Sequence, residues 1–252
     1  AGYDVVKNPV EVKERIGYLP EGAPTYGDMT PSSFLSFIGE IRGFDGKERQ
    51  SRIDKVVEKV RLKEVLFQPI ETLSKGFKRR VGLAQAILHD PKILILDEPT
   101  DGLDPNQKHH VRMLINEMAK EKAIIVSTHI LEEVEAVCTD VLIISGGKLI
   151  EKGTPEELLM RDPNRNSVVI NFKRENLGTI EKALRSFEVV GRNDECQGRS
   201  ALMGFRVMSK PGVETLFAVT ELIQKRKLPV EEVFSEKGTL DSVFRKITAQ
   251  TE

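Results

Sequence analysis

Cysteine is scarce in this sequence: only Cys138 and Cys196 occur among its 252 residues. They lie far apart and form no Cys-x-x-Cys pair, which argues against a disulfide framework and against a thiolate metal cage. A chain of this length buries about three quarters of its unfolded surface and needs no disulfides for stability. We therefore expect both residues to be reduced thiols of a cytosolic protein.

Long apolar runs and an excess of one charge are also missing. The apolar run 93–96 is far shorter than the ~20 residues of a membrane span, and no signal-like segment opens the sequence. Lys and Arg total 38 and Asp and Glu 39, so the formal net charge is −1. A nucleic-acid-binding domain is expected to be clearly basic. The composition predicts a protein that is soluble by itself and has no nucleic-acid partner.

What is present is an alternation of helix and strand over the first part of the chain. Thr30-Pro31 and Asp104-Pro105 are helix-start signals, and apolar residues repeat at helical spacing after each. The predicted strands are 15–19, 92–96 and 123–126, the last two buried in a parallel sheet, and the predicted helices are 31–43, 47–61, 77–88, 105–118 and 131–137. This pattern is typical of an α/β domain with a helical subdomain at about 28–90.

The rest of the sequence follows a different alternation. A hairpin around Gly146-Gly147 belongs to the end of a first domain, predicted to span residues 1–160. A polar linker, 161–166, leads to residues 167–252, whose β-α-β-β-α-β order predicts a small α+β domain. This second domain carries no catalytic triad, metal spacing or glycine-rich loop, so an accessory or regulatory role is expected.

The clearest chemical signal is the acidic pair Asp97-Glu98, which ends the apolar run 93–96. A strand buried on both faces can hold carboxylates at the carboxyl edge of a sheet, where ligands of open α/β sheets bind. One carboxylate can hold Mg²⁺ and the next can orient a water. A strand followed by an acidic turn gives the same pair, so the pair alone leaves both interpretations open.

Three weaker signals surround this pair. Leu73-Ser-Lys-Gly-Phe77 is a short turn that opens a helix, an arrangement that presents backbone N–H groups to a phosphate. The cations at 78–80 add positive charge, although such a run is more often a solvated helix face. Asp101-Gly-Leu-Asp104 follows the pair, and His129 follows the strand 123–126, where a lone histidine is usually structural.

Taken in order, these segments resemble the ATP-binding subunit of an ABC transporter. Residues 73–77 are similar to the signature motif, Asp97-Glu98 to the end of the Walker B strand, 101–104 to the D-loop and His129 to the H-loop histidine. The resemblance covers roughly the first 160 residues. It implies a P-loop NTPase core with a helical subdomain, and ATP and Mg²⁺ as cofactors.

The resemblance implies how one ATP site works. Asp97 acts through Mg²⁺, Glu98 polarises the attacking water and His129 contacts the γ-phosphate. At the Q-loop position, which contacts Mg²⁺ and the water, the family has a glutamine and this sequence has Glu21. A carboxylate still binds a metal, but its added charge beside phosphates needs compensation.

The resemblance also implies a surface that serves a partner chain, in a homodimer or a heterodimer of ATPase chains. Ser74 and Gly76 contact the γ-phosphate of ATP bound to that partner, and Asp104 lies in the loop that links the two sites. Lys75 stands where the family has glycine, and Phe77 where it has glutamine. Lys75 can add a phosphate contact, so these departures are expected to alter activity in detail and not to abolish it.

The family's phosphate loop, Gly-x-x-x-x-Gly-Lys-Ser/Thr, has no counterpart in these 252 residues. The Gly-Lys pairs at 46–47 and 147–148 are not followed by Ser or Thr. The aromatic residue that stacks on adenine is missing as well. We expect a chain that lacks the first strand–P-loop–helix unit and does not bind ATP tightly by itself, with a natural short form as the alternative.

The function implied is that of an ATP-hydrolysing subunit that powers export through a separate integral membrane permease, from a peripheral position on the cytoplasmic face of the cell membrane. Residues 239–244 look like the end of ATPases that serve two-component exporters, such as gliding-motility exporters. The permease is expected near the helices at 31–61 and the loop before them. Tyr26, Met29 and Phe34 are contact candidates, and a core position is the alternative for Phe34.

Two other functions stay open. A soluble ABC ATPase without a transport role usually has two cassettes or a long coiled-coil insert, and this sequence has one cassette and no heptads. A non-catalytic regulatory or binding chain would leave the set formed by Asp97, Glu98 and His129 unexplained.

Overall fold

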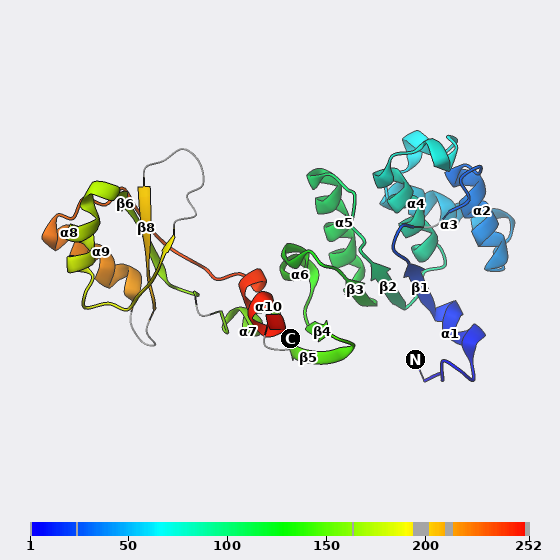
Figure 1. The fold of residues 1–252 in the computed structure, drawn as a ribbon. Coiled ribbons are helices and arrows are strands. Elements are labelled where there is room, and N and C mark those ends of the chain that lie inside the picture. Colours follow the sequence, from blue (N-terminus) through cyan, green and yellow to red (C-terminus); the bar gives the residue numbers. More distant parts are fainter. Residues whose placement is uncertain (1, 24, 163, 194–201, 210–213, 250–252) are drawn as a thin grey trace. The chain divides into compact units, whose positions relative to one another are not determined.

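The computed structural model describes residues 2–23, 25–162, 164–193, 202–209 and 214–249. It divides into two compact units, residues 1–138 and 139–252, each with a hydrophobic core of its own (Figure 1). Cys138 is a half-buried free thiol, and burial raises its pKa; Cys196 lies outside the described residues. Among the described helices, none has the length and apolar character needed to cross a membrane.

Unit 1 alternates helices and strands as expected. Its elements are α1 Pro9–Arg15, β1 Ile16–Leu19, α2 Pro31–Ile41, α3 Gly46–Lys59, η1 Lys63–Val65, η2 Ile70–Thr72, α4 Lys75–Ile87, β2 Ile93–Asp97, α5 Pro105–Met118, β3 Ala123–Ser127 and α6 Leu131–Val137. The side chains of Thr30 and Asp104 each accept a hydrogen bond from a backbone N–H in the first turn of the helix that follows. These caps confirm the predicted starts of α2 and α5.

The three strands of unit 1 form a parallel sheet in the order β1-β2-β3. Leu19 pairs with Leu96, and Asp97 with Ser127. Because parallel strands end at the same edge, the register places the segments after all three strands next to one another. The predicted site residues Glu21, Asp97, Glu98 and His129 belong to these segments.

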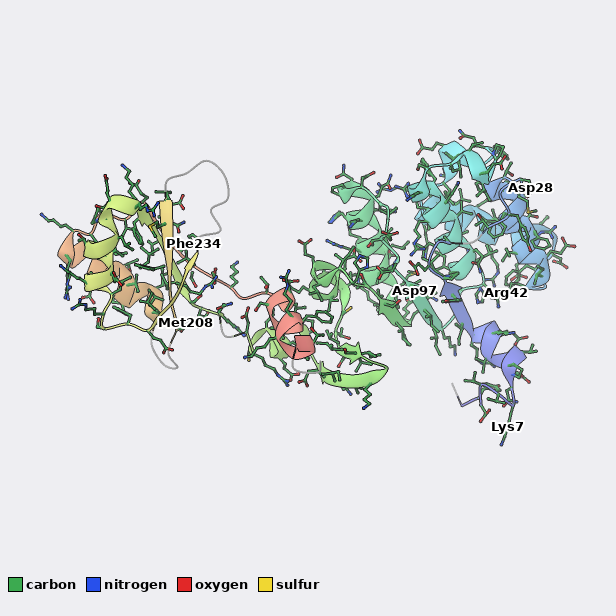
Figure 2. All side chains as sticks on the ribbon, in the orientation of Figure 1. Lys7, Asp28, Arg42, Asp97, Met208 and Phe234 are labelled. Carbon is green, nitrogen blue, oxygen red and sulfur yellow. The ribbon has the colours of Figure 1, made fainter. Side chains whose placement is uncertain are left out.

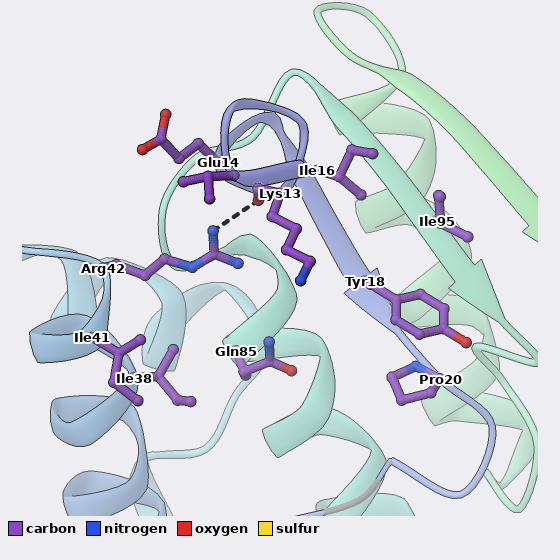
Figure 3. Close-up of a pocket in the computed structure, with 11 residues that line it drawn as sticks. Lys13, Glu14, Ile16, Tyr18, Pro20, Ile38, Ile41, Arg42, Gln85 and Ile95 are labelled. Atoms are coloured by element: carbon purple, nitrogen blue, oxygen red, sulfur yellow. Dashed lines mark hydrogen bonds between the residues drawn. The ribbon is translucent and has the colours of Figure 1, made fainter. Parts of the chain in front are cut away.

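The prediction that strand 123–126 is buried is wrong. β3 is the edge strand of the described sheet, and Ile125 is 60% exposed. It shares one sheet face with its register partners Tyr18 and Ile95. Tyr18 and Ile95, together with residues of α1, α2 and α4, line a hollow of about 790 Å³, where Arg42 donates a hydrogen bond to the Lys13 carbonyl (Figure 3).

The predicted helical subdomain is present as α2, α3 and α4, which pack on one another in unit 1. Phe34 is only 3% exposed and belongs to the core, so its core interpretation is confirmed. Tyr26 is 56% exposed and contacts the rings of Phe34 and Phe37 edge to face.

Unit 2 contains the predicted small α+β domain. Its elements are β4 Val141–Ser145, β5 Lys148–Gly153, α7 Pro155–Leu159, β6 Val168–Lys173, η3 Arg174–Asn176, α8 Leu177–Ala183, β7 Val189–Asn193, β8 Leu202–Val207, α9 Thr215–Arg226, β9 Glu232–Ser235 and α10 Leu240–Ala249. The strands β6 to β9 form an antiparallel sheet in the order β7-β8-β6-β9, which confirms the β-α-β-β-α-β arrangement.

The hairpin β4–β5 turns at Gly146 and Gly147, both with positive φ, as a two-residue hairpin turn requires. The compact units divide at 138/139, so this hairpin and α7 group with the second unit, whereas the sequence assigns them to the first domain. The physical reason is that α10 packs on α7, and that Asp162 after α7 accepts a hydrogen bond from the Thr239 amide before α10.

Candidate functional site

The first carboxylate of the candidate site is Asp97, the last residue of β2. Its side chain is half-buried, and its Oδ1 accepts a hydrogen bond from the hydroxyl of Ser127 at the end of β3. Figure 2 labels Asp97 at the sheet of unit 1. Two neighbouring strands therefore hold this carboxylate at the carboxyl edge, as the sequence predicts.

The second carboxylate, Glu98, pairs with His129. Glu98 Oε1 accepts a hydrogen bond from the His129 amide at 3.0 Å and lies 2.8 Å from His129 Nδ1, while its Oε2 accepts from the Thr128 hydroxyl at 3.3 Å. The Glu98 backbone adopts φ +48°, which is uncommon for a residue with a side chain. The hydrogen bond with Glu98, together with its charge, raises the pKa of the exposed His129 imidazole.

A third residue at this edge, Arg79, was not predicted from the sequence. The run of cations at 78–80 favours a solvated helix face. Arg79 in α4 is instead 5% exposed, and Arg80 is 8% exposed, so that expectation is wrong. The Arg79 guanidinium donates to the Pro20 carbonyl at 3.0 Å and to the carbonyls of Asp97 and Glu98. Burial makes such a cation costly unless carbonyls and carboxylates surround it, and here they do.

Glu21 follows Pro20 in a turn closed by the Ala23 amide, which donates to the Pro20 carbonyl at 3.1 Å. The Glu21 side chain is exposed and makes no hydrogen bond to another described residue. It lies close enough to the Arg79 guanidinium for its charge to favour the cation. Arg79 therefore joins the turn that carries Glu21 to the end of β2.

A buried carboxylate, Glu133, contacts the Glu98–His129 pair through Thr128. Glu133 in α6 is 1% exposed, and its Oε1 accepts a hydrogen bond from the Thr100 hydroxyl. Its Oε2 lies 3.5 Å from the hydroxyl of Thr128, the residue that also contacts Glu98. Arg112 Nη2 lies 3.7 Å from Glu133 Oε1 and balances the buried charge. No sequence signal identified Glu133, because an acidic residue in a first helical turn is common.

The signature-like residues form a second group, at the start of α4. Ser74 caps the helix by accepting a hydrogen bond from the Phe77 amide at 3.4 Å. Gly76 is buried, and a Cβ there would lie 2.4 Å from Gln107 Oε1. The Phe77 ring packs partly against the core, with the Arg80 guanidinium 5.2 Å above it. A side chain at position 76 would therefore displace the Gln107 amide.

The segment 101–104 packs against this second group. Asp104 caps α5 by accepting a hydrogen bond from the Gln107 amide at 2.9 Å, and the same Gln107 approaches Gly76. Lys75 is exposed and lies beside Gly102, which has φ +71°. Within the described residues, no hydrogen bond or ion pair joins residues 74–77 to Asp97, Glu98 or His129. The structure thus brings the predicted residues together as two groups.

The donor set at the strand ends suits Mg²⁺ better than a metal held by protein alone. No group of three or more His, Cys, Asp or Glu side chains among the described residues could hold a metal ion. Mg²⁺ is usually bound by one or two carboxylates together with substrate phosphates and waters. The Asp97 carboxylate beside the Ser127 hydroxyl is a donor set of this kind.

Comparisons with known proteins agree with these observations. A family model described as "ABC transporter" matches residues 3–101. NatA, an ABC transporter ATP-binding protein of Bacillus subtilis (strain 168), is 37% identical over 159 residues, which are 62% of this chain and 65% of NatA. The linearmycin resistance ATP-binding protein LnrL of the same bacterium is 35% identical over 161 residues, 64% of this chain and 52% of LnrL.

A solved structure is similar as well. The ATP binding subunit of an ABC transporter superposes with a TM-score of 0.57 at 30% identity, covering 64% of this chain and 67% of that chain. The chain spans between about half and two thirds of the length of the curated relatives NatA and LnrL.

Proposed function

Because the chain belongs to the ABC transporter ATP-binding family, we propose that it is the ATP-hydrolysing subunit that powers a separate membrane permease. The observation that carries this proposal is the Glu98–His129 pair, held 2.8 Å apart at the carboxyl edge of a parallel sheet. ATP hydrolysis needs a group that positions the attacking water and groups that stabilise charge on the phosphate. This edge offers both.

Asp97 and Glu21 are the residues that hold Mg²⁺ in this proposal. Carboxylate oxygens are hard ligands of the kind that Mg²⁺ prefers. When bound, Mg²⁺ neutralises the charge of the phosphates. The Ser127 hydroxyl donates to Asp97 and orients its carboxylate.

Glu98 orients the attacking water and accepts its proton. Its carboxylate is fixed on one oxygen by the His129 amide and imidazole and on the other by Thr128, so its free lone pairs keep one direction. The His129 side chain is 73% exposed and would contact the γ-phosphate. Positioned proton transfer of this kind contributes about 10²–10⁴-fold to a reaction rate.

The second group, Ser74, Lys75, Gly76 and Phe77 with Asp104, serves the ATP bound by a partner chain in a dimer. The support is that the start of α4 and the D-loop segment pack together as one surface. The N-terminus of a 13-residue helix offers backbone N–H groups to an anion. The partner is a second copy or a different ATPase chain.

The permease docks on the helical subdomain near Tyr26, which is 56% exposed and stacks edge to face on Phe37. Met29 packs on the core and supports this surface from below. We place the chain peripherally on the cytoplasmic face of the membrane and assign it to export, since one relative is named for resistance to linearmycin.

The 252-residue polypeptide by itself is proposed to bind ATP weakly. Its sequence holds no Gly-x-x-x-x-Gly-Lys-Ser/Thr pattern to cradle the phosphates. Isothermal titration of ATP into this polypeptide tests the proposal, and a submicromolar dissociation constant contradicts it.

The test of the catalytic assignment is Glu98→Gln in the complete ATPase, assembled with its permease in vesicles. We expect ATP hydrolysis to fall by about 10²-fold or more, because an amide accepts no proton from water. The matched control is Glu132→Gln, which changes an exposed glutamate of α6 and should retain the full rate. Unchanged hydrolysis in Glu98→Gln contradicts the proposal. Hydrolysis that no permease stimulates favours an ATPase without a transport role.

A further inference from the structure

The least explained residue of the site is Arg79. One guanidinium, 5% exposed, donates to three backbone carbonyls on two segments: Pro20 on one side, and Asp97 and Glu98 on the other. Pro20 directly precedes Glu21. Arg79 thus links the turn that carries one proposed ligand to the two residues that carry the other carboxylates.

The charges around Arg79 are unbalanced. Its pKa is lowered by burial and raised by four carboxylates, Asp101, Asp97, Glu98 and Glu21. The four carboxylates repel one another, and one buried cation offsets only part of their charge. Glu21 is the member that the family's glutamine does not supply.

Arg80, the next residue, shows that burial in α4 does not by itself produce these contacts. It is 8% exposed, yet its guanidinium faces the Arg61 carbonyl at 3.4 Å and the Phe77 ring at 5.2 Å. Neither contact involves the strand ends. The contacts of Arg79 are therefore specific to its position and are not a general property of this helix.

We infer that Arg79 is a positioning residue that fastens the Glu21 turn to the Asp97–Glu98 segment and balances the extra carboxylate of Glu21. A planar guanidinium suits this role, because its fork of N–H donors can reach several carbonyls while its charge stays fixed. The inference rests on the proposed function for its effect on catalysis, but the link between the two segments is a property of this chain alone.

The catalytic test is a double-mutant cycle on Mg²⁺-dependent ATP hydrolysis by the complete transporter. We expect Arg79→Met to lower turnover by about 10²-fold, the loss that follows a misplacement of catalytic groups by about 1 Å. Adding Glu21→Gln to Arg79→Met should recover about tenfold, because it removes the carboxylate left without its cation. In the matched control background, Arg80→Met, Glu21→Gln should have only the effect that it has alone.

The structural test needs no nucleotide. Backbone hydrogen exchange in the full chain should be faster at residues 20–23 and 98–101 in Arg79→Met and unchanged there in Arg80→Met. Arg79→Lys keeps the charge and loses the fork, so exchange should stay fast while Glu21→Gln no longer improves turnover. If Arg79→Met does not fold, Arg79→Lys carries the test.

Two results overturn the inference: additive effects of Arg79→Met and Glu21→Gln on turnover, or unchanged exchange at residues 20–23 when Arg79 is replaced. A different result overturns the proposed function. If Glu98→Gln retains full hydrolysis, the catalytic assignment fails, and the exchange experiment still decides whether Arg79 links the two segments.

Discussion

Each unit of the molecule places carboxylates beside an arginine, but the balance differs. In unit 2, Glu236 accepts two hydrogen bonds from Arg206, both at 2.9 Å, and a third from the Ser167 hydroxyl at 3.0 Å. In unit 1, four carboxylates act on the buried Arg79 guanidinium. The hydrogen bonds of Arg79 go to backbone carbonyls and not to these carboxylates. In unit 2 one cation balances one carboxylate, whereas the carboxylates around Arg79 outnumber it.

The difference separates a structural cluster from a functional one. A carboxylate held directly by the cation that balances its charge, as Glu236 is by Arg206, stabilises the fold. Carboxylates that crowd around one cation cost folding free energy, which a bound Mg²⁺ with its nucleotide can offset. Removing a carboxylate should therefore destabilise unit 2 and stabilise unit 1, and the following experiments test that contrast.

The largest effect is expected for Glu236→Ala. It leaves the part-buried Arg206 guanidinium and the fully buried Ser167 without their acceptor. We expect a loss of about 2 kcal/mol in the free energy of unfolding of unit 2, measured by urea denaturation of the full chain. The exposed Glu175→Ala is the control and should change stability by less than ~0.5 kcal/mol. Equal losses of unfolding free energy in the two variants would contradict a stabilising role for Glu236.

A smaller effect is expected at Asp162, which is 5% exposed. Burial alone raises its pKa, but hydrogen bonds from Ser242, Asn164 and Thr239 outweigh burial and lower the pKa below its ordinary value. The stabilisation is present above the unfolded pKa of ~3.9 and is lost as pH falls through the folded pKa. Asp162→Asn should cost about 1 kcal/mol at pH 7. The cost should shrink toward pH 3; a cost independent of pH contradicts the assignment.

The opposite sign is expected for Asp97→Asn. The amide removes one of the four negative charges around Arg79, and its oxygen can still accept from the Ser127 hydroxyl. We expect unit 1 to gain about 0.5 kcal/mol without Mg²⁺ or nucleotide, and Mg²⁺-dependent hydrolysis to be lost. Thermal unfolding of the full chain in chelator measures the gain. A loss of stability would show that Asp97 is a structural carboxylate like Glu236.

Much of the fold of unit 1 could be predicted from the sequence. The capping residues Thr30 and Asp104 begin α2 and α5 where predicted, because an N-cap acts within a few residues of its own position. The helix predicted from residue 77 begins at Lys75 instead, where Ser74 caps it. The apolar run at 93–96 predicts β2, because a strand buried in a sheet needs apolar residues on both faces.

The parts that could not be predicted depend on contacts between distant segments. Arg79 and Glu133 look like ordinary helix-surface charges, and only the packing of α4 and α6 at the strand ends buries them. The exposure of β3 could not be predicted either, because an apolar run does not distinguish an edge strand from a central strand. The sequence therefore indicated the strand-end carboxylates and His129, but gave no sign that Arg79 and Glu133 are buried beside them.

The smallest effect compares two histidines of unit 1. His89 is half-buried near Arg42, and desolvation lowers its pKa to about 4, whereas the exposed His129 has its pKa raised by the hydrogen bond with Glu98. A raised pKa means that the Glu98–His129 ion pair is fully formed below the unfolded value of ~6.5 and is lost as pH rises through the folded pKa.

NMR titration of the imidazoles in the full chain measures both groups at once. In Glu98→Gln, the pKa of His129 should fall, because an amide removes the charge that favours the imidazolium, while His89 should remain near 4. Arg79→Lys should leave the direction of the His129 shift intact, since Glu98 keeps its carboxylate. An unchanged His129 titration in Glu98→Gln would mean that the pair is not formed in solution, and the open edge of unit 1 would then lack the contact on which its proposed chemistry depends.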